Sequence, residues 1–237
     1  MGKSETRTET ARVARTPKKA SAPARRSTAA KAETPYHHGA LREALLEAAG
    51  RVLEREGLSG LTLRAVAREA GVSHAAPTHH FGDLTGLLSE LAAVGFRQFN
   101  AAMASSCDAA TTPLARALAR PKAYVAYAQA HPGMYGIMFR TERLDYSRPS
   151  LREAAEASFA GLANAIGMMR QEQISEDSLT LNQGAAIARA WSMVHGFTML
   201  LLDGRLEDIL GRLPEGTTAE QLLEAMLTAP ITAKLPA

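Results

Sequence analysis

A chain of 237 residues, 46% apolar and 22% charged with a formal net charge of +3, can bury a core and is expected to form one or two folded units. Its single cysteine, Cys107, excludes an intrachain disulfide and a thiolate-rich zinc site. No run of about 18 uncharged apolar residues is present, and the N-terminal MGKSETRTET lacks an apolar segment. We therefore expect no membrane-spanning helix and no secretory signal, and a cytoplasmic protein.

Residues 1–35 differ from the rest of the chain in composition and charge. They hold nine of the 27 Lys and Arg residues and three of the 24 Asp and Glu residues, which makes this segment +6 and the remainder −3. After Met1 its only large aliphatic residue is Val13, so it cannot bury enough surface to offset the entropy of ordering. We predict a disordered basic tail, which either follows DNA phosphates or serves only as a solubilising leader.

The first predicted helix is LREALLEAAGRVLEREG (41–57), in which apolar residues recur at steps of three and four. Gly57 stands where a left-handed C-cap is common. The next segment, SGLTLRAVAREAG (59–71), predicts a helix with Thr62 as its N-cap and Gly71 as its end.

A short helix is predicted over HAAPTHHF (74–81), with Ser73 as its N-cap. Pro77 falls at the end of the first turn, where a lost amide hydrogen bond costs less than in a helix interior. Asp83 is the expected N-cap of a long helix over 84–103.

The chain from Thr111 onward contains further helical patterns, each bounded by proline, glycine or a capping residue. These segments are 113–130, 132–139, 149–173, 178–203 and 217–228. Alternating strand patterns are nearly absent, and no internal repeat is found. The sequence therefore predicts an all-α protein of about nine helices.

The two short helices joined by Gly71-Val72-Ser73 fit a helix-turn-helix. Ala67 is small enough for the second helix to cross closely, and Gly71 permits the positive φ that reverses the chain. In such a unit the N-terminal residues of the second helix meet base edges in the major groove of DNA. The spacing alone also occurs in many unrelated proteins.

The run LTLRAVAREAGVSHAAPTHHFGDLTGLL (61–88) resembles the DNA-binding segment of the TetR family of transcriptional regulators. The preceding YHHGALREALLEAAGRVLEREG (36–57) resembles that family's first helix. AHPGMYGIMF (130–139) and WSMVHG (191–196) are similar to the C-terminal domain of a subgroup with a Trp…His-Gly motif. The resemblance extends from residue 36 to the late 220s and leaves the tail outside it.

The resemblance implies a three-helix DNA-binding head over 36–82 and a larger helical body over 83–237 for effector binding and dimerisation, after the tail at 1–35. It further implies a homodimer that binds a palindromic operator in double-stranded DNA through two recognition helices ~34 Å apart. Such a protein is usually a repressor, released when a small effector binds. It needs no cofactor, is not an enzyme, and is expected on the nucleoid in the cytoplasm.

Two other functions stay open. A DNA-binding protein that responds to no effector would act through its tail and head alone. A helical enzyme would need a convergent nucleophile and base, and no Ser/His/Asp or Cys/His arrangement at usable spacing is found.

By their place in the motif, residues around the recognition helix are expected to face DNA, together with a histidine near the start of the first helix. They are Thr62, Arg64, Ser73, His74, Ala75, Ala76, Thr78, His79 and His38. Alanine methyls suit thymine methyls, and histidines can donate to phosphate or to guanine. Ordinary capping by Thr62 and plain solvation of Arg64 are the alternatives, and Phe81 is expected in the core of the head.

Two positions depart from the family pattern. Thr78 stands where a tyrosine is common and Leu84 where a lysine is common, and both of those residues usually contact the DNA backbone. Residues 36–90 also hold five arginines, no lysine and seven acidic residues, a balance of −2. Phosphate neutralisation supplies most non-specific affinity, so we hypothesise that the tail adds cations as a minor-groove arm and that the histidines gain charge as the pH falls.

A metal site among the histidines of the head is not expected. On a helix, His74 and His79 are about 140° apart around the axis, and His79 and His80 about 100° apart. No nearby cysteine or well-spaced carboxylate completes a tetrahedron.

Methionine and aromatic residues concentrate in the body and suit an apolar or aromatic effector. The candidate ligand-binding residues are Met134, Tyr135, Met138, Phe139, Met168, Trp191 and His195. Trp191 and His195 are four residues apart and share a helix face, so they either line a pocket or form a structural pair. For each methionine, ordinary packing in the helical core is the alternative.

The last two helices, 178–203 and 217–228, are the expected dimer surface by analogy with the family. Small residues in the first of them permit close packing of helices. They are Gly184, Ala185, Ala188 and Gly196.

Overall fold

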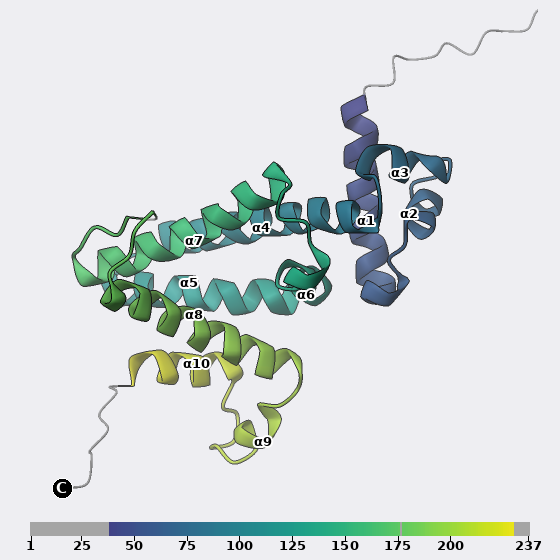
Figure 1. Cartoon of the computed structure of the whole chain (residues 1–237). Helices are drawn as coiled ribbons and strands as arrows, with labels where there is room; N and C mark the ends of the chain where they lie inside the picture. Colours follow the sequence, from purple (N-terminus) through teal and green to yellow (C-terminus); the bar gives the residue numbers. More distant parts are fainter. Residues whose placement is uncertain (1–37, 176, 230–237) are drawn as a thin grey trace, which may run out of the picture. The chain divides into compact units, whose positions relative to one another are not determined.

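The structure, a computed structural model, describes residues 38–175 and 177–229 (Figure 1). Within these ranges every regular element is helical: ten α-helices and one 3-10 helix. The all-α prediction is confirmed, and the α-helix beyond the expected nine is the four-residue α9 (Glu207–Leu210). The tail predicted over residues 1–35 lies outside the described residues.

Three helices form the head: α1 (His38–Gly60), α2 (Leu63–Glu69) and α3 (Ala75–Phe81). Gly57 has a φ of 68° and a ψ of −175°, so it interrupts the helix at a positive φ, and one further turn follows it to the end of α1. Gly71, between α2 and α3, also has a φ of 68°. Only glycine adopts this backbone region without strain, so both chain reversals depend on it.

The caps of the two short helices differ from each other. The Thr62 hydroxyl accepts a hydrogen bond from the Ala65 amide at 3.1 Å, so the predicted cap of α2 is confirmed. The prediction for Ser73 is wrong, because His74 is the N-cap of α3 and makes no side-chain cap bond. His74 already has helical dihedrals, and the Ala76 amide donates to the Ser73 carbonyl at 3.0 Å, so the backbone carbonyl takes the role expected of the hydroxyl.

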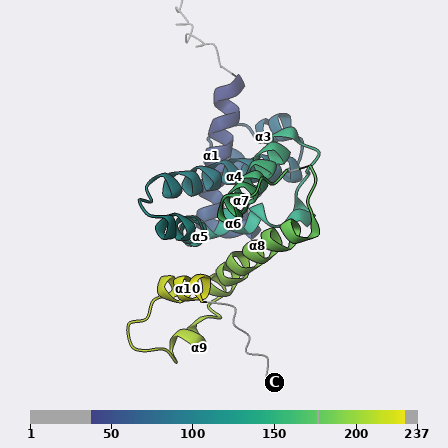
Figure 2. The same cartoon turned by 90° about the vertical axis from the view of Figure 1, so that its left-hand side faces the viewer.

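The remaining helices form the body. They are α4 (Leu84–Asp108), α5 (Pro113–Ala130), α6 (Pro132–Met138), the 3-10 helix η1 (Thr141–Arg143), α7 (Pro149–Arg170), α8 (Leu181–Leu202), α9 and α10 (Ala219–Thr228). Helix α4 packs beside both α5 and α7, α8 packs against α5 and α7, and α10 packs on α5 (Figures 1 and 2).

Side-chain caps set where α4, α8 and α10 begin. The Asp83 carboxylate accepts from the Gly86 amide at 2.7 Å, which confirms the predicted cap of α4. Thr180 and Gln183 form a capping box, so α8 begins at Leu181 and not at residue 178 as expected. A second box, formed by Thr218 and Gln221, begins α10.

One apolar core extends from the head into the body, and α6 lies where they meet. A Cβ on Gly133 of α6 would lie 3.1 Å from Leu53 of α1. A Cβ on Gly95 of α4 would lie 2.8 Å from Met134 and 2.9 Å from Met138. Helix α6 therefore contacts both the first helix of the head and the long helix that follows the head.

Candidate functional site

Helix α3 is amphipathic, and this divides its residues between the core and the surface. Pro77 and Phe81 are four apart and point inward, and Phe81 is only 1% exposed. Most of the residues expected to face DNA are exposed, and Ala76 is half-buried; the exposed ones are Thr62, Arg64, Ser73, His74, Ala75, Thr78 and His79. His38 begins α1, and its side chain lies outside the described residues.

Ion pairs within the head decide which of its arginines are available to a phosphate. Glu69 of α2 binds Arg51 at 2.8 Å and Arg55 at 3.0 Å, and hydrogen bonds from Arg51 and then Arg55 lower the pKa of Glu69. Arg42 is paired with Glu90. Among the described residues, Arg64 and Arg68 are the two arginines of the head without an ion pair.

An aromatic cluster forms in the body where α5, α6 and α8 meet. The Phe139 ring lies 4.9 Å from the Tyr135 ring, 4.9 Å from the His195 ring and 6.5 Å from the Trp191 ring. Four of the seven predicted ligand-binding residues thus come together from two helices. Tyr124 of α5 completes the group, with its ring 5.8 Å from that of Tyr135.

Two tyrosine hydroxyls converge on one nitrogen of His195. The Nδ1 atom lies 2.7 Å from the Tyr135 hydroxyl and 3.0 Å from the Tyr124 hydroxyl, and the two hydroxyls are 3.0 Å apart. Burial raises the pKa of Tyr124 to about 12 and also raises that of Tyr135, so both hydroxyls remain protonated. Burial lowers the pKa of His195, which favours the neutral ring.

This geometry suits a neutral imidazole. A neutral imidazole has one donor and one acceptor nitrogen, and a hydroxyl can either donate or accept, so Nδ1 shares one hydrogen bond with the two hydroxyls in either tautomer. In the tautomer that accepts at Nδ1, the proton is on Nε2, which is then a hydrogen-bond donor beside the Phe139 and Trp191 rings. In that tautomer the cluster combines aromatic faces with one donor.

The other predicted ligand-binding residues lie apart from this group. Met134 and Met138 lie on α6 but pack against Gly95 of α4. Met168 is 72% exposed near the end of α7, and none of the ring contacts or hydrogen bonds of the cluster involves it. Tyr124 was missed by sequence reasoning, because no pattern within α5 indicates that its hydroxyl meets a histidine 71 residues later.

A groove of about 500 Å³ lies elsewhere, between α5 and α10, and includes none of the predicted ligand-binding residues. Lys122 lines it and is paired with Glu220 at 3.1 Å and Glu224 at 2.9 Å. Both carboxylates belong to α10, so these ion pairs join α10 to α5 at the groove and leave the Lys122 cation already paired.

Helix α8 has an uncovered apolar face. It is long and apolar enough to cross a membrane by length and composition, with a mean hydropathy of 1.3, yet Ile187, Val194 and Phe197 pack inward. Only 28% of this apolar window is buried. Leu181 is 88% exposed, Ala185 and Ala188 are exposed, and this face remains for another surface to cover.

Comparisons with known proteins give a consistent result. Residues 45–91 match the family model for bacterial regulatory proteins of the tetR family, and residues 115–229 match the model for a tetracyclin repressor-like C-terminal domain. A solved structure of a protein with unknown function from Rhodococcus sp. RHA1 is 33% identical; the alignment covers 82% of this chain and 95% of that one, with a TM-score of 0.65.

Two named regulators share the fold at lower identity. A TetR family transcription regulator from Marinobacter aquaeolei VT8 is 18% identical, with 80% of this chain and 94% of that one covered and a TM-score of 0.52. The TetR family transcriptional regulator PfmR from Thermus thermophilus is 18% identical, with 77% and 94% covered and a TM-score of 0.51. No curated protein matches the chain.

Proposed function

Because this chain belongs to the TetR family of bacterial transcriptional regulators, we propose that it is a homodimeric repressor that leaves a palindromic operator when a small apolar or aromatic effector binds. As a member of this family it is a DNA-binding regulator, and we infer that it acts on the nucleoid in the cytoplasm without catalysing a reaction. The observation that carries the DNA-binding role is the outward side of α3, where polar residues are exposed over a buried Phe81.

The outward side chains of α3 supply the proposed base contacts. The residues on this side of α3, or in the turn that leads into it, are Ser73, His74, Ala75, Ala76, Thr78 and His79. Thr62 and Arg64 begin α2 and are proposed to bind phosphate, with unpaired Arg68 as a third candidate and His38 as a contact from α1.

Selection of bound duplexes from random DNA, with the full chain, tests this role. We expect a palindromic sequence, and we expect His79→Ala to weaken binding to it by about 1–3 kcal/mol, as for one lost base contact. Gln98→Ala, an exposed change on α4, is the control and leaves affinity unchanged. Recovery of no preferred sequence by the wild-type protein would refute the operator-binding role.

The few free arginines of the head support a role for the basic tail in DNA binding. Deleting residues 1–33 removes nine cations and, by this hypothesis, makes the fall of operator affinity with salt shallower by about 0.9 in log–log slope for each lost phosphate contact. An unchanged slope would make the tail a solubilising leader. The histidine part of the hypothesis requires tighter binding at about pH 6 than at about pH 8.

The aromatic cluster supports an effector site in the body. Trp191, Phe139 and Tyr135 offer faces for an aromatic or apolar ligand, and the Nε2 proton of His195 suits a ligand with a hydrogen-bond acceptor. Helix α6 carries one of these rings, leads directly into a second, and packs on Leu53 of α1, so a ligand that displaces α6 also moves the head. We place Met134 and Met138 behind this site, and we give Met168 no role in it.

A thermal-shift screen of aromatic and apolar ligands, followed by release of the selected DNA, tests the effector. We expect ligands that carry a carbonyl or ether acceptor to be selected and to lose their effect in Trp191→Ala. If the protein binds its DNA and no ligand in the screen releases it, the regulator that responds to no effector becomes the better explanation.

A further inference from the structure

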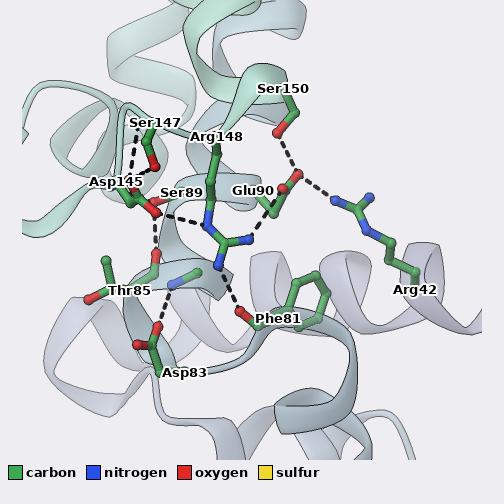
Figure 3. Close-up of polar contacts among 11 residues, drawn as sticks. Arg42, Phe81, Asp83, Thr85, Ser89, Glu90, Asp145, Ser147, Arg148 and Ser150 are labelled. Atoms are coloured by element: carbon green, nitrogen blue, oxygen red, sulfur yellow. Dashed lines mark hydrogen bonds and ion pairs between the residues drawn. The ribbon is translucent and has the colours of Figure 1, made fainter.

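A polar network joins the end of the recognition helix to the body (Figure 3). Arg148 directly precedes α7, and its Nη2 atom donates to the carbonyl oxygen of Phe81, the last residue of α3, at 3.0 Å. A cation at the carbonyl end of a helix is favourable both as a hydrogen-bond donor and through the helix dipole. Arg148 therefore contacts the helix that the proposed function places in the DNA groove.

The carboxylate of Glu90 holds the other side of this guanidinium. Glu90 is 8% exposed, and its Oε1 atom lies 3.7 Å from Arg148 Nη1. Its Oε2 atom accepts from the Ser150 hydroxyl at 2.9 Å and pairs with Arg42 of α1. One buried carboxylate thus joins α1, α4 and the start of α7.

The guanidinium of Arg148 is confined on its remaining sides. Its Nε atom lies 3.5 Å from Asp145 Oδ2 and is buried without a hydrogen bond. A Cβ on Gly86 would lie 2.5 Å from Arg148 Nη2 and would overlap the Phe81 carbonyl oxygen. Only glycine at position 86 lets the guanidinium and this carbonyl meet, so the contact is built into the first turn of α4.

Arg148 ends the same stretch of chain that forms part of the aromatic cluster. Tyr135 and Phe139 lie at one end of residues 132–148, and Asp145 and Arg148 lie at the other. The Asp145 amide donates to the Ser89 hydroxyl at 2.8 Å, and that hydroxyl donates to the Thr85 carbonyl at 2.7 Å, so the second end is held on α4. The backbone from Phe139 to Arg148 and the hydrogen bond from Arg148 to Phe81 thus link the rings to the end of α3.

We propose that Arg148 is the positioning residue that couples the recognition helix to the effector-facing segment 132–148. Its bond to Phe81 holds α3 in one orientation on the body, and loss of that bond frees α3 to sample others. An operator needs a single orientation of each head, so freeing α3 reduces the fraction of molecules competent to bind. The affinity part of this proposal rests on the proposed DNA-binding function.

Hydrogen–deuterium exchange tests the contact without any DNA. In Arg148→Met we expect the amides of residues 82–88 to exchange at least about tenfold faster than in the wild-type protein, because they connect α3 to α4. Arg148→Lys keeps the charge for Glu90 but lacks the fork that reaches Phe81 as well, so it shows an intermediate rate. Arg152→Met is the control, since Arg152 is exposed and its guanidinium pairs with Glu156 at 3.9 Å on the same helix.

Affinity and fluorescence then test the coupling. For DNA selected with the wild-type protein, we expect Arg148→Met to bind about tenfold more weakly and Arg152→Met to bind as the wild type does. The chain's single tryptophan, Trp191, reports on the cluster, and its emission should change on DNA binding in the wild type and not in Arg148→Met.

Exchange and affinity within about twofold of wild type in Arg148→Met would overturn the proposal, as would full coupling of the Trp191 emission in that variant. If Arg148→Met does not fold, the same measurements on Arg148→Lys decide. If the wild-type protein selects no DNA, the proposed function fails while the exchange experiment still judges the contact.

Discussion

At the scale of single residues, the charge state of His195 depends on its surroundings. Its ring packs against Tyr135, Phe139 and Trp191, and two hydroxyls approach its Nδ1 atom. Burial lowers the pKa of His195 and so favours the uncharged ring. The body therefore holds a neutral imidazole at neutral pH, with the tyrosine hydroxyls as hydrogen-bond partners of Nδ1.

The lowered pKa of His195 predicts a loss of stability in acid. The unfolded histidine, with a pKa of about 6.5, takes up a proton before the folded one does. The stabilisation is therefore fully present above that pH and is lost as the pH falls through the lower folded pKa. We expect His195→Asn to flatten this part of the pH dependence of the free energy of unfolding, measured by urea titration between about pH 7 and pH 5.

His74→Asn is the matched control for this measurement, since His74 is exposed on the head. It should leave the acid-side loss as it is in the wild-type protein. A His195→Asn curve parallel to the wild-type curve would show that the neutral ring contributes nothing to acid sensitivity.

The two tyrosines that approach His195 predict a non-additive pair of mutations. Either Tyr124→Phe or Tyr135→Phe alone leaves one hydroxyl for Nδ1, so each should cost about 1 kcal/mol of folding free energy. The double variant leaves Nδ1 buried without a donor and should cost about 1 kcal/mol more than the two single losses together. Denaturant unfolding of all four proteins measures this, and strict additivity would mean that the hydroxyls act independently.

At the scale of elements, the two short helices of the head begin in different ways. Thr62 caps α2 with its side chain, whereas the first turn of α3 is closed by the backbone carbonyl of Ser73. The hydroxyl of Ser73 therefore does not cap α3, which agrees with the DNA contact proposed for it. Sequence reasoning assigned the same capping role to both residues.

This difference predicts unequal effects of two similar mutations. Thr62→Ala should lower the free energy of unfolding by about 1 kcal/mol, as for a lost N-cap, while Thr62→Ser should keep most of it. Ser73→Ala should change it by less than about 0.5 kcal/mol, since no cap bond is lost. Equal losses in Thr62→Ala and Ser73→Ala, measured by urea unfolding, would contradict these assignments.

At the scale of the whole molecule, the apolar face of α8 is not buried by the rest of the same chain. Apolar and small residues stand along it, and open space surrounds the Cβ positions of Gly184 and Gly196. A second copy that packs on this face would bury it, with α10 beside it. This is the arrangement that the proposed homodimer requires.

A charge placed on this face is expected to separate the subunits. Ala188→Glu introduces a carboxylate where small residues permit close packing, so it should shift the protein from dimer to monomer in sedimentation velocity. Ala104→Glu, on an exposed position of α4, should remain a dimer. A dimeric Ala188→Glu protein would move the interface away from α8.

Much of the fold followed from local patterns. The apolar spacing in 41–57, the glycines at 57 and 71 and the caps at Thr62 and Asp83 each depend on residues a few positions apart. The burial of the Phe81 side chain was predicted in the same way, from its place in the motif. The prediction that the Ser73 hydroxyl caps α3 was wrong. The dihedrals of His74, the following residue, bring the Ser73 carbonyl and not its hydroxyl to the Ala76 amide.

For the candidate sites, too, local patterns predicted some features and missed others. Sequence patterns predicted which side chains of α3 lie at the surface, and they selected the rings at α6 and α8. Met168, predicted together with those rings, lies apart from them near the end of α7, because helical composition does not tell which ends of two helices meet.

Local sequence patterns were enough to predict the helical class, the helix boundaries to within about five residues, and the family, because all three depend on neighbouring residues and on motifs in a given order. The contact of Tyr124 with His195 and that of Arg148 with Phe81 became visible only in the folded chain, since they span 71 and 67 positions. It also decided that Gly86 faces a guanidinium. Contacts of this kind depend on how helices pack, and packing depends on the whole set of buried surfaces and not on any one segment.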